Sequence, residues 1–363
     1  MNYSHVGMSV QGLDTPALLI DLDVMESNIK RMATFFRDKR AHVRPHVKSH
    51  KIPEIAQIQV AAGAPGVCAA KVGEAEAMVD GGIGDVLVAN QVVGETKIAR
   101  LVSLAERARV GVAVDDAENV AALSRAAKAQ GVTLGVVVEV DIGMGRCGVS
   151  GPEAALRLVR QAIDRPGLEF RGLMGYEGHV MRAKDAATRQ EMCMEAMRQL
   201  MQAVTHVGNH GIPVPEVSGG GTLTYDISGS YPGLTEIQAG SYALMDTNFR
   251  NAGSPFKCAM TVLATVISTP RDGAAIADAG MKSLSTDFGL PETKSPSGMV
   301  LQKLAEEHTV LAVAAGVKVR AGDRIEILPS HGCTTVNLHD TAYAVRNGRV
   351  EDVWRVTGRG KSQ

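Results

Sequence analysis

The sequence predicts an α/β protein in which a TIM-like (β/α)8 barrel is followed by a C-terminal all-β domain. The middle of the chain alternates short apolar runs with longer segments of helical period. The runs are almost uninterrupted series of Val, Ile and Leu, as in parallel strands that are covered on both faces. Beyond about residue 250 the helical segments cease, whereas short strand patterns continue. A length of 363 residues accommodates both parts.

The barrel prediction rests on eight strand patterns joined by helical segments. The expected strands cover residues 42–44, 66–69, 85–89, 110–114, 134–140, 170–176, 214–218 and 235–238. The expected helices cover residues 53–61, 72–79, 95–107, 117–130, 152–163 and 184–207, and an apolar face from Met25 to Phe36 marks one more before the first strand. A doubly wound sheet is the alternative, but the glycine-rich phosphate fingerprint of that fold does not follow the first strand.

The last third of the chain predicts a β domain. Strands are expected at 262–267, 274–278, 309–313, 323–328 and 342–345, and residues 286–298 are expected to form a loop. The strand at 17–21 is assigned to the same sheet, because it would be a ninth strand in the barrel. The expected divisions are therefore residues 1–22 for this N-terminal strand, 23–250 for the barrel and 251–363 for the β domain.

Composition narrows the class of function. Lys and Arg number 38 against 39 Asp and Glu, and the net charge of −1 offers no electrostatic surface for nucleic acid or an anionic membrane. The apolar runs are far shorter than the roughly 20 residues of a membrane span, and residues 1–11 lack the apolar core of a signal peptide. The five cysteines are odd in number and scattered, which argues against a disulfide framework. We therefore expect a cytoplasmic enzyme.

Two basic residues follow strands of the barrel, at the end where barrel enzymes place their catalytic groups. Lys48 follows the first strand, where partial desolvation makes a lysine amine nucleophilic; the alternative is a basic surface loop. Arg146 follows the fifth strand in a turn with three glycines, whose backbone can approach a ligand closely. The alternative is an ordinary turn in which Arg146 pairs with Asp141.

Two loops rich in Gly, Ser and Thr follow the seventh and eighth strands. They are Ser218-Gly219-Gly220-Gly221-Thr222 and Gln238-Ala239-Gly240-Ser241-Tyr242. Barrels typically hold phosphate groups with backbone N–H groups at these two places. The two loops together predict a phosphate site.

In the β domain, His331 and Cys333 stand two positions apart. If they lie on a strand, both side chains share one face and could bind a single ion. An imidazole nitrogen and a thiolate suit zinc or another borderline metal. The alternative is a buried cysteine beside an ordinary histidine.

Taken together, these segments resemble the fold-type III pyridoxal phosphate enzymes, the alanine-racemase-like barrels, and within them the D-threonine aldolase and D-serine dehydratase branch. The resemblance covers nearly the whole chain. Its motifs, besides the two glycine loops, are Asp14-Thr15-Pro16-Ala17, Arg44-Pro45-His46-Val47-Lys48-Ser49-His50-Lys51, Asp141-Ile142-Gly143-Met144-Gly145-Arg146-Cys147-Gly148 and Val353-Trp354.

The resemblance implies roles around pyridoxal 5'-phosphate. Lys48 would hold the cofactor aldehyde as a Schiff base, Arg146 would donate to its phenolate oxygen, and Tyr176 would line its ring. Gln238 would face the pyridine nitrogen, where racemases of this fold place an arginine. The phosphate would be held by a set of loop residues, namely Gly221, Thr222, Gly240, Ser241 and Tyr242.

The resemblance also implies a metal and a substrate class. His331 and Cys333 would coordinate a divalent ion (Mn, Zn, Mg or Co) that engages the β-hydroxyl of a D-configured amino acid. His179 is a candidate catalytic base, and its alternative is a solvated loop histidine. Enzymes of this type commonly form homodimers, which we expect here by resemblance.

The reaction has two main candidates, both of them lyase reactions. Gln238 and the segment at 278–283 resemble D-threonine aldolases, which cleave the substrate into glycine and an aldehyde. The cysteine of the His331 and Cys333 pair resembles the D-serine and D-3-hydroxyaspartate dehydratases, which release ammonia, whereas typical D-threonine aldolases have an aspartate at that position. We favour the aldolase, because two segments resemble the aldolases and only the metal-ligand pair resembles the dehydratases. A racemase without metal and a non-catalytic carrier of pyridoxal phosphate are less favoured, the carrier because it would lack the β domain.

Overall fold

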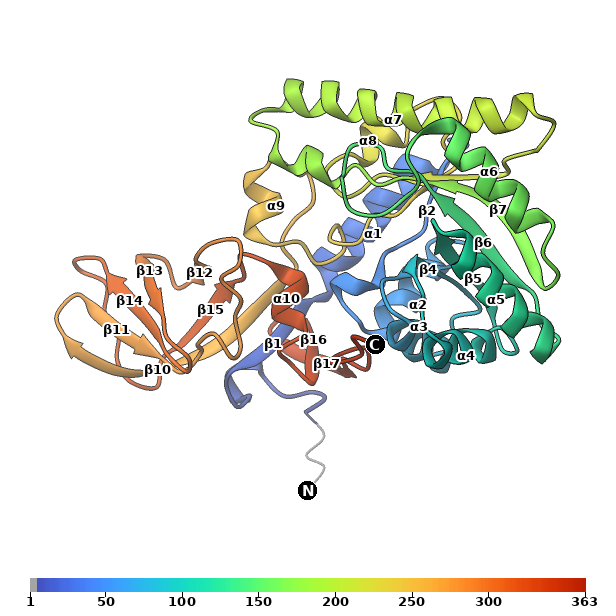
Figure 1. Ribbon diagram of the computed structural model, residues 1–363. Helices are drawn as coiled ribbons and strands as arrows, with labels where there is room; N and C mark the ends of the chain where they lie inside the picture. Colours follow the sequence, from blue (N-terminus) through green and yellow to red (C-terminus); the bar gives the residue numbers. More distant parts are fainter. Residues whose placement is uncertain (1–4) are drawn as a thin grey trace. The chain divides into compact units, whose positions relative to one another are not determined.

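The computed structural model describes residues 5–363, which form two compact units (Figure 1). The β unit contains Met1–Lys30, Ser49–Ile52 and Ser241–Gly360, and its first four residues lie outside the described part. The barrel unit contains Arg31–Lys48, Pro53–Gly240 and Lys361–Gln363. The division expected from the sequence at residues 22 and 250 stays a prediction.

The barrel unit is built on a parallel sheet that contains eight strands within residues 5–363, in the order β2-β9-β8-β7-β6-β5-β4-β3. The strands are β2 (His42–Val43), β3 (Val67–Ala69), β4 (Asp85–Gln91), β5 (Arg109–Val114), β6 (Leu134–Glu139), β7 (Leu168–Met174), β8 (Glu216–Gly219) and β9 (Glu236–Ile237). A parallel bridge between His46 and Cys68, with the amide of Cys68 2.8 Å from the carbonyl oxygen of Pro45, joins the two ends of the sheet. The barrel prediction is therefore confirmed.

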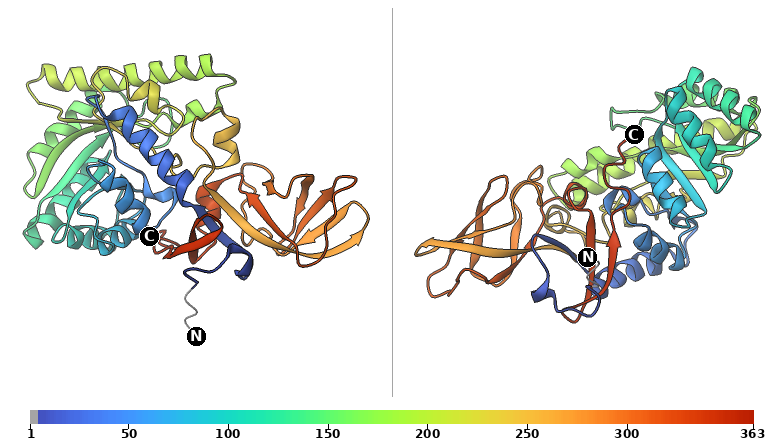
Figure 2. Two further views of the ribbon diagram at one scale, coloured as in Figure 1. Left: turned by 180° about the vertical axis from the view of Figure 1, so that it is seen from behind. Right: turned by 90° about the horizontal axis from the view of Figure 1, so that it is seen from below.

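Helices follow the strands and cover the outside of the sheet (Figures 1 and 2). They are α2 (Pro53–Ala61), α3 (Val72–Asp80), α4 (Glu95–Leu104), α5 (Ala117–Gln130), α6 (Gly151–Ile163), α7 (Ala186–Asn209) and the short α8 (Tyr225–Ser228), preceded by α1 (Leu22–Phe36). Local sequence explains their ends. Asp116 caps α5 by accepting from the amide of Asn119, and Gly131 ends it in the left-handed conformation. All seven predicted helices are present.

The inside of the barrel combines an apolar layer with charged side chains. The apolar layer consists of one residue from each of five neighbouring strands, Cys68, Leu87, Ala113, Val137 and Met174. Arg171 of β7 also lies inside and is only 1% exposed. Gly111 and Gly135 make room for it, since a Cβ at Gly135 would lie 2.2 Å from Cδ of Arg171. The apolar strand patterns did not predict this buried arginine.

The β unit is built on a sheet that contains nine strands in the described part of the chain. The strands are β1 (Ala17–Asp21), β10 (Met260–Arg271), β11 (Ala274–Ala277), β12 (Glu292–Ser295), β13 (Met299–Leu304), β14 (Thr309–Val313), β15 (Arg324–Leu328), β16 (Thr341–Arg346) and β17 (Arg349–Arg355). As predicted, β1 belongs to this sheet, between β10 and β16. The loop expected at 286–298 was wrong in part, because β12 lies within it and pairs with β15. Its residues are polar and give no apolar alternation.

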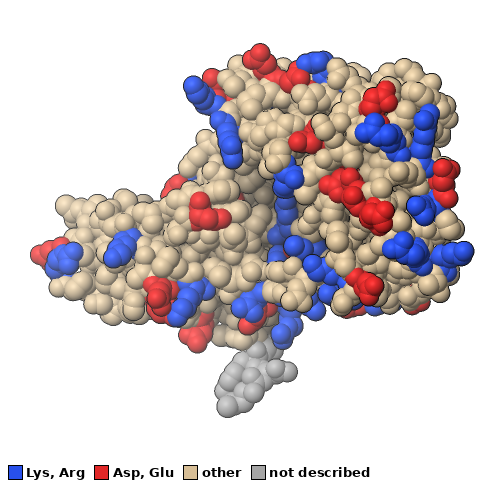
Figure 3. Space-filling model, viewed as in Figure 1, with Lys and Arg blue, Asp and Glu red and all other residues tan. Residues whose placement is uncertain are grey.

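The cysteines, the surface charge and the helix lengths can be set beside the composition. All five cysteines are free thiols. Basic and acidic side chains are interspersed on the face that Figure 3 shows, in keeping with the net charge of −1. Among residues 5–363, no helix has the length and apolar character needed to cross a membrane.

Candidate active site

Three of the predicted cofactor residues come together on one aromatic ring. Lys48 lies in a short 3-10 helix, Val47–Ser49, that follows β2. Its Nζ is 5.8 Å from the centroid of the Tyr176 ring, and Cζ of Arg146 is 5.7 Å from the same centroid. Tyr176 follows β7, so the loops after three different strands meet at this ring. Lys48 and Arg146 are both exposed and accessible to a small molecule.

The loop after β6 presents Arg146 through a turn organised by Asp141. Oδ1 of Asp141 accepts hydrogen bonds from the amides of Gly143 and Gly145, each at 3.1 Å. Both glycines have positive φ, of 111° and 64°, which side chains disfavour. Arg146 does not pair with Asp141, because that carboxylate holds the turn. Nη2 of Arg146 instead lies 3.9 Å from Oε1 of the buried Glu139.

Glu177 anchors the glycine loop after β8. It is 2% exposed, and its Oε2 accepts from the amide of Gly220 at 3.0 Å. Its Oε1 accepts from the hydroxyls of Thr224, at 2.7 Å, and Ser228, at 2.6 Å. The hydroxyl oxygen of Thr224 in turn accepts from the amide of Gly221 at 3.0 Å. Sequence analysis missed Glu177, and the only available signal was its place next to Tyr176.

Close packing requires glycine at Gly219, where a Cβ would lie 2.7 Å from the carbonyl oxygen of Gly175. A Cβ at Gly221 would make an ordinary contact, 3.4 Å from Cε2 of Tyr176. The predicted phosphate loop therefore borders the ring that Lys48 and Arg146 share. Thr222 is buried beside it.

Gln238, which follows β9, belongs to a buried polar chain. Its Nε2 donates to Oγ of Ser218 at 2.8 Å, and Ser218 donates to Oε1 of Glu236 at 2.6 Å. Arg44 donates from Nε to Oε2 of Glu236, also at 2.6 Å. Burial by itself would raise the pKa of Glu236, but Arg44 and the hydrogen bonds to the carboxylate hold it at about 2. Sequence analysis named Ser218 and Arg44 only as parts of motifs and missed Glu236.

His179 lies in the 3-10 helix Gly178–Arg182 after β7. Its ring packs against the loop after β6, since a Cβ at Gly143 would lie 3.0 Å from Cε1 of His179. Its Nδ1 is buried and has no hydrogen-bond partner within residues 5–363. This position at the carboxyl end of the strands agrees with its selection as a candidate base, but that role stays a prediction.

In the β unit, His331 and Cys333 do not lie on a strand. His331 is the N-cap of a short helix, α10 (Gly332–Val336), and Cys333 lies in its first turn. The strand geometry assumed from the sequence was therefore wrong, because β15 ends at Leu328. The turn nevertheless places Cys333 close enough to His331 to raise the pKa of the imidazole. Asp246 fixes the start of the helix by accepting from the amide of Gly332 at 2.8 Å.

The surroundings of His331 orient its ring. Nδ1 lies 2.5 Å from Oδ2 of Asp287, and the ring of Phe288 stacks on the imidazole at a centroid distance of 4.2 Å. Burial would lower the pKa of His331, but its contacts with Cys333 and Asp287 raise it to about 9. Oγ of Ser241 lies 4.0 Å from Sγ of Cys333.

The donor set of this cluster fits a borderline divalent metal. Imidazole nitrogen and thiolate sulfur are its ordinary ligands, and the hydrogen bond from Nδ1 to Asp287 leaves Nε2 for an ion. Among residues 5–363, however, no group of three or more His, Cys, Asp or Glu side chains stands ready to hold a metal. Further ligands would have to come from water or substrate.

Two other loop residues were predicted to bind phosphate. Gly240 ends the barrel unit, and Tyr242 lies in the β unit, where its buried ring packs on Phe256 at a centroid distance of 5.7 Å. The phosphate roles of all the loop residues stay predictions.

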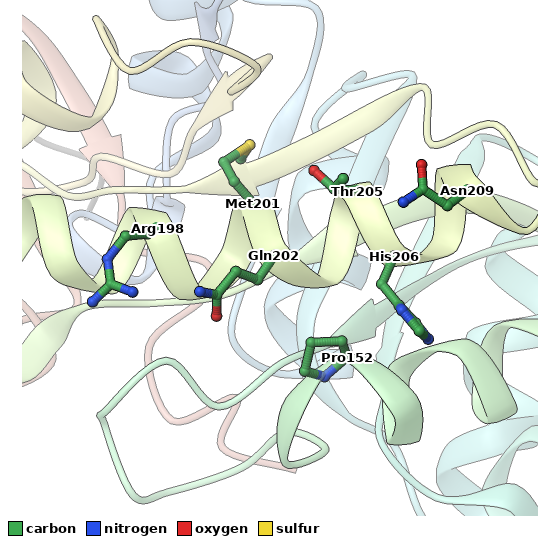
Figure 4. Close-up of a pocket in the computed structure, with 7 residues that line it drawn as sticks. All are labelled: Pro152, Arg198, Met201, Gln202, Thr205, His206 and Asn209. Atoms are coloured by element: carbon green, nitrogen blue, oxygen red, sulfur yellow. The ribbon is translucent and has the colours of Figure 1, made fainter.

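A surface pocket lies elsewhere, along α7 (Figure 4). Its lining comes from α6 and α7 and consists of Pro152, Arg198, Met201, Gln202, Thr205, His206 and Asn209. None of these residues is a predicted site residue, and the pocket is not part of the candidate active site.

Comparison with known proteins agrees with this geometry. Residues 20–247 match the family model for the alanine racemase N-terminal domain, and residues 259–345 match the putative serine dehydratase domain. A D-threonine aldolase of an Arthrobacter species is 39% identical over 97% of this chain and 94% of its own length. A 3-hydroxy-D-aspartate aldolase of Paracoccus denitrificans is 37% identical, with 98% and 94% covered.

The D-threo-3-hydroxyaspartate dehydratase of a Delftia species is less similar, with 31% identity over 89% of this chain and 92% of its own length. Among solved structures, the crystal structure of D-threonine aldolase from Filomicrobium marinum matches with a TM-score of 0.96 and 39% identity, covering 99% of both chains. The chain therefore belongs to the alanine-racemase-like, fold-type III family of pyridoxal phosphate-dependent enzymes and is a lyase of its D-threonine aldolase branch.

Proposed function

We propose that the protein cleaves D-β-hydroxy amino acids such as D-threonine or D-3-hydroxyaspartate into glycine and an aldehyde, in a retro-aldol reaction that depends on a divalent metal. The observation that carries the proposal is the meeting of Lys48 and Arg146 on the ring of Tyr176, at the carboxyl ends of the barrel strands. Pyridoxal phosphate, when bound, supplies an electron sink that weakens the bonds at the substrate Cα.

The side chains around that ring have separate tasks in this proposal. The amine of Lys48 attaches the cofactor aldehyde, and the guanidinium of Arg146 donates to its phenolate oxygen. Tyr176 supports the ring, while amides of the loops at 219–222 and 239–242 bind the phosphate. Gln238 offers an uncharged amide to the pyridine nitrogen, in keeping with a reaction that differs from racemisation.

The β unit supplies the metal ligands in the proposal. His331 and Cys333 hold an ion such as Mn²⁺, Zn²⁺, Mg²⁺ or Co²⁺, which lowers the pKa of a bound hydroxyl and so assists its deprotonation. Asp287 keeps the imidazole of His331 in the orientation that leaves Nε2 toward the ion. His179, whose Nδ1 has a buried and unused lone pair or proton, is the candidate base in the barrel unit.

Dehydration of D-serine or D-3-hydroxyaspartate is the second candidate. The His331 and Cys333 pair favours it, because a cysteine at the second position resembles the dehydratases, whereas typical D-threonine aldolases have an aspartate there. Against it, the two aldolase relatives share 39% and 37% identity with this chain, whereas the dehydratase shares 31%. We therefore place the aldolase first.

Two further properties belong to the proposal. The state of the five cysteines, all free thiols, supports a location in the reducing cytoplasm. A homodimer is the assembly we expect from the family resemblance, and sedimentation of the purified protein would test it.

Product analysis tests the proposed reaction. The purified protein, loaded with pyridoxal phosphate, is incubated with D-threonine or D-serine, with EDTA or with added Mn²⁺. Glycine and acetaldehyde from D-threonine, lost with EDTA and restored by Mn²⁺, are the expected result. Release of 2-oxobutanoate or pyruvate with ammonia would instead establish the dehydratase, and formation of the L-isomer alone would establish a racemase.

A lysine variant tests the role of Lys48 in the same protein. Lys48→Ala is expected to lose the visible absorbance of the bound cofactor together with activity, because the amine that attaches the aldehyde is gone. Lys97→Ala, which removes an exposed lysine of α4, is the matched control and keeps both. A folded Lys48→Ala protein that retained the visible band would contradict the proposal.

A further inference from the structure

The polar chain behind Gln238 crosses the inside of the barrel. Gln238, Ser218 and Glu236 lie on or just after the neighbouring strands β8 and β9, and Arg44 follows β2 beside them. Ser218 and Glu236 are each 1% exposed, so water does not compete for their hydrogen bonds. This chain is buried like the core but consists entirely of polar groups, which proteins keep inside only when they are paired.

The direction of every hydrogen bond in the chain is determined. The carboxylate of Glu236 is ionised beside Arg44, so it can only accept. The hydroxyl of Ser218 has one proton, and that proton is committed to Oε1 of Glu236. Oγ of Ser218 must therefore accept from Gln238, so the nitrogen of the Gln238 amide faces Ser218. A flipped amide would set its carbonyl oxygen against an oxygen that has no proton left to donate.

Charge is balanced before the chain reaches Gln238. Arg44 donates from Nε to Glu236 and from Nη1 to Asp85, each at 2.6 Å. His42 adds a third contact to Glu236, with Nε2 3.3 Å from Oε2. Nη1 of Arg109 also lies 3.5 Å from Asp85, so two guanidinium groups face two carboxylates, and only the neutral hydroxyl of Ser218 links Glu236 to Gln238.

We propose that Ser218 and Glu236 are positioning residues that lock the amide of Gln238 in one orientation and so fix the neutral hydrogen-bonding surface offered to the cofactor's pyridine nitrogen. The inference rests on the proposed binding of pyridoxal phosphate and adds the residues that position Gln238. Neither residue touches the cofactor in this account, and both act through Gln238.

Ser218→Ala tests the proposal in the full-length protein loaded with pyridoxal phosphate. The variant removes the acceptor for Gln238, and the amide becomes free to rotate. We expect the pH at which the visible band of the cofactor changes to move, and kcat for D-threonine to fall about threefold to tenfold, the value of one hydrogen bond, with little change in KM. Glu236→Gln, which is isosteric, is expected to act in the same direction because its amide can donate to Ser218.

A matched truncation separates this role from a general loss of packing. Ser124→Ala removes another buried serine hydroxyl, on α5, which donates to the carbonyl oxygen of Pro166 at 2.7 Å. It is expected to leave the pH dependence of the visible band unchanged. In a Gln238→Ala background, Ser218→Ala is also expected to have no further spectral effect, because the residue through which it acts is absent.

The outcomes are distinct. A shift in Ser218→Ala that disappears in the Gln238→Ala background supports the inference. The inference is overturned if Ser218→Ala and Glu236→Gln both keep the wild-type spectrum, or if Ser218→Ala shifts the band equally with and without Gln238. A wild-type protein that gains no visible band with pyridoxal phosphate would overturn the proposed function itself, a result separate from the other two.

Discussion

Removal of the Glu177 carboxylate is expected to weaken both the glycine loop after β8 and the binding of the cofactor. Glu177 accepts from one backbone amide, that of Gly220, and from the hydroxyls of Thr224 and Ser228. Glu177→Ala leaves these donors inside the protein without their acceptor. The loop that borders Tyr176 then loses its anchor.

The loss of stability in Glu177→Ala depends on whether each donor finds another acceptor. The hydroxyl of Ser228 can turn to Sγ of Cys193, 3.1 Å away, so it stays satisfied. The amide of Gly220 and the hydroxyl of Thr224 gain no new acceptor, and each unsatisfied buried donor costs about 1–3 kcal/mol. We therefore expect the free energy of unfolding to fall by about 2–6 kcal/mol. If a quarter to a half of that cost must be repaid when the loop closes on a phosphate, about 0.5–3 kcal/mol, the affinity for pyridoxal phosphate falls by about twofold to 150-fold.

Glu177→Gln is the matched variant. With its amide oxygen toward Gly220 and its nitrogen toward the two hydroxyls, glutamine preserves the backbone contact, so the loss should be about 1–2 kcal/mol. Urea unfolding of the cofactor-free proteins measures stability, and fluorescence titration with pyridoxal phosphate measures affinity. The reasoning is refuted if Glu177→Ala binds the cofactor as tightly as the wild type, or if the glutamine variant is the weaker of the two.

Two further predictions concern other carboxylates. Asp287→Asn is expected to weaken Mn²⁺ or Zn²⁺ binding about tenfold in a calorimetric titration, because the acceptor that orients the ring of His331 loses its charge; an unchanged affinity would contradict it. Glu236 has a folded pKa of about 2, below its ordinary 4.5. Its stabilisation is therefore complete above pH 4.5 and is lost as the pH falls toward 2, by roughly 3 kcal/mol in total. Urea unfolding should accordingly show that the stability advantage of the wild type over Glu236→Gln shrinks between pH 7 and pH 3. A constant difference would show that Arg44 does not lower the pKa of the Glu236 carboxylate.

Local patterns predicted most elements of the barrel, because apolar period, caps and glycine turns are properties of neighbouring residues. The segments around Lys48, Arg146 and Tyr176 could be placed after their strands in this way, and the parallel topology then brought them to one end of the sheet. β12 was missed because its own residues carry no such local pattern. Its polar residues form a strand because β15 lies beside them, and nothing in their own pattern shows it.

Partners distant in sequence explain what was missed in the site. The hydrogen-bond donors to Glu177 come from the next strand–helix unit, and Glu236 is paired with Arg44, which comes from the other end of the barrel sequence. His331 and Cys333 were chosen correctly as neighbours, but their contact depends on where β15 ends and α10 begins, which Asp246 helps to fix. Sequence spacing could not distinguish a strand from a helix start.

The order of strands and helices, and the places of the lysine and glycine loops, could be read from the amino-acid sequence, since these depend on short-range backbone preferences. Which polar side chains enter the barrel depends on tertiary packing. Arg171 turns inward at a register shift between β6 and β7, where Gly111 and Gly135 leave space for it. The neighbouring strands supply both its room and its charge partner, since Nε of Arg171 donates to Oε1 of Glu216 on β8 at 2.9 Å, and no pattern within β7 itself specifies either.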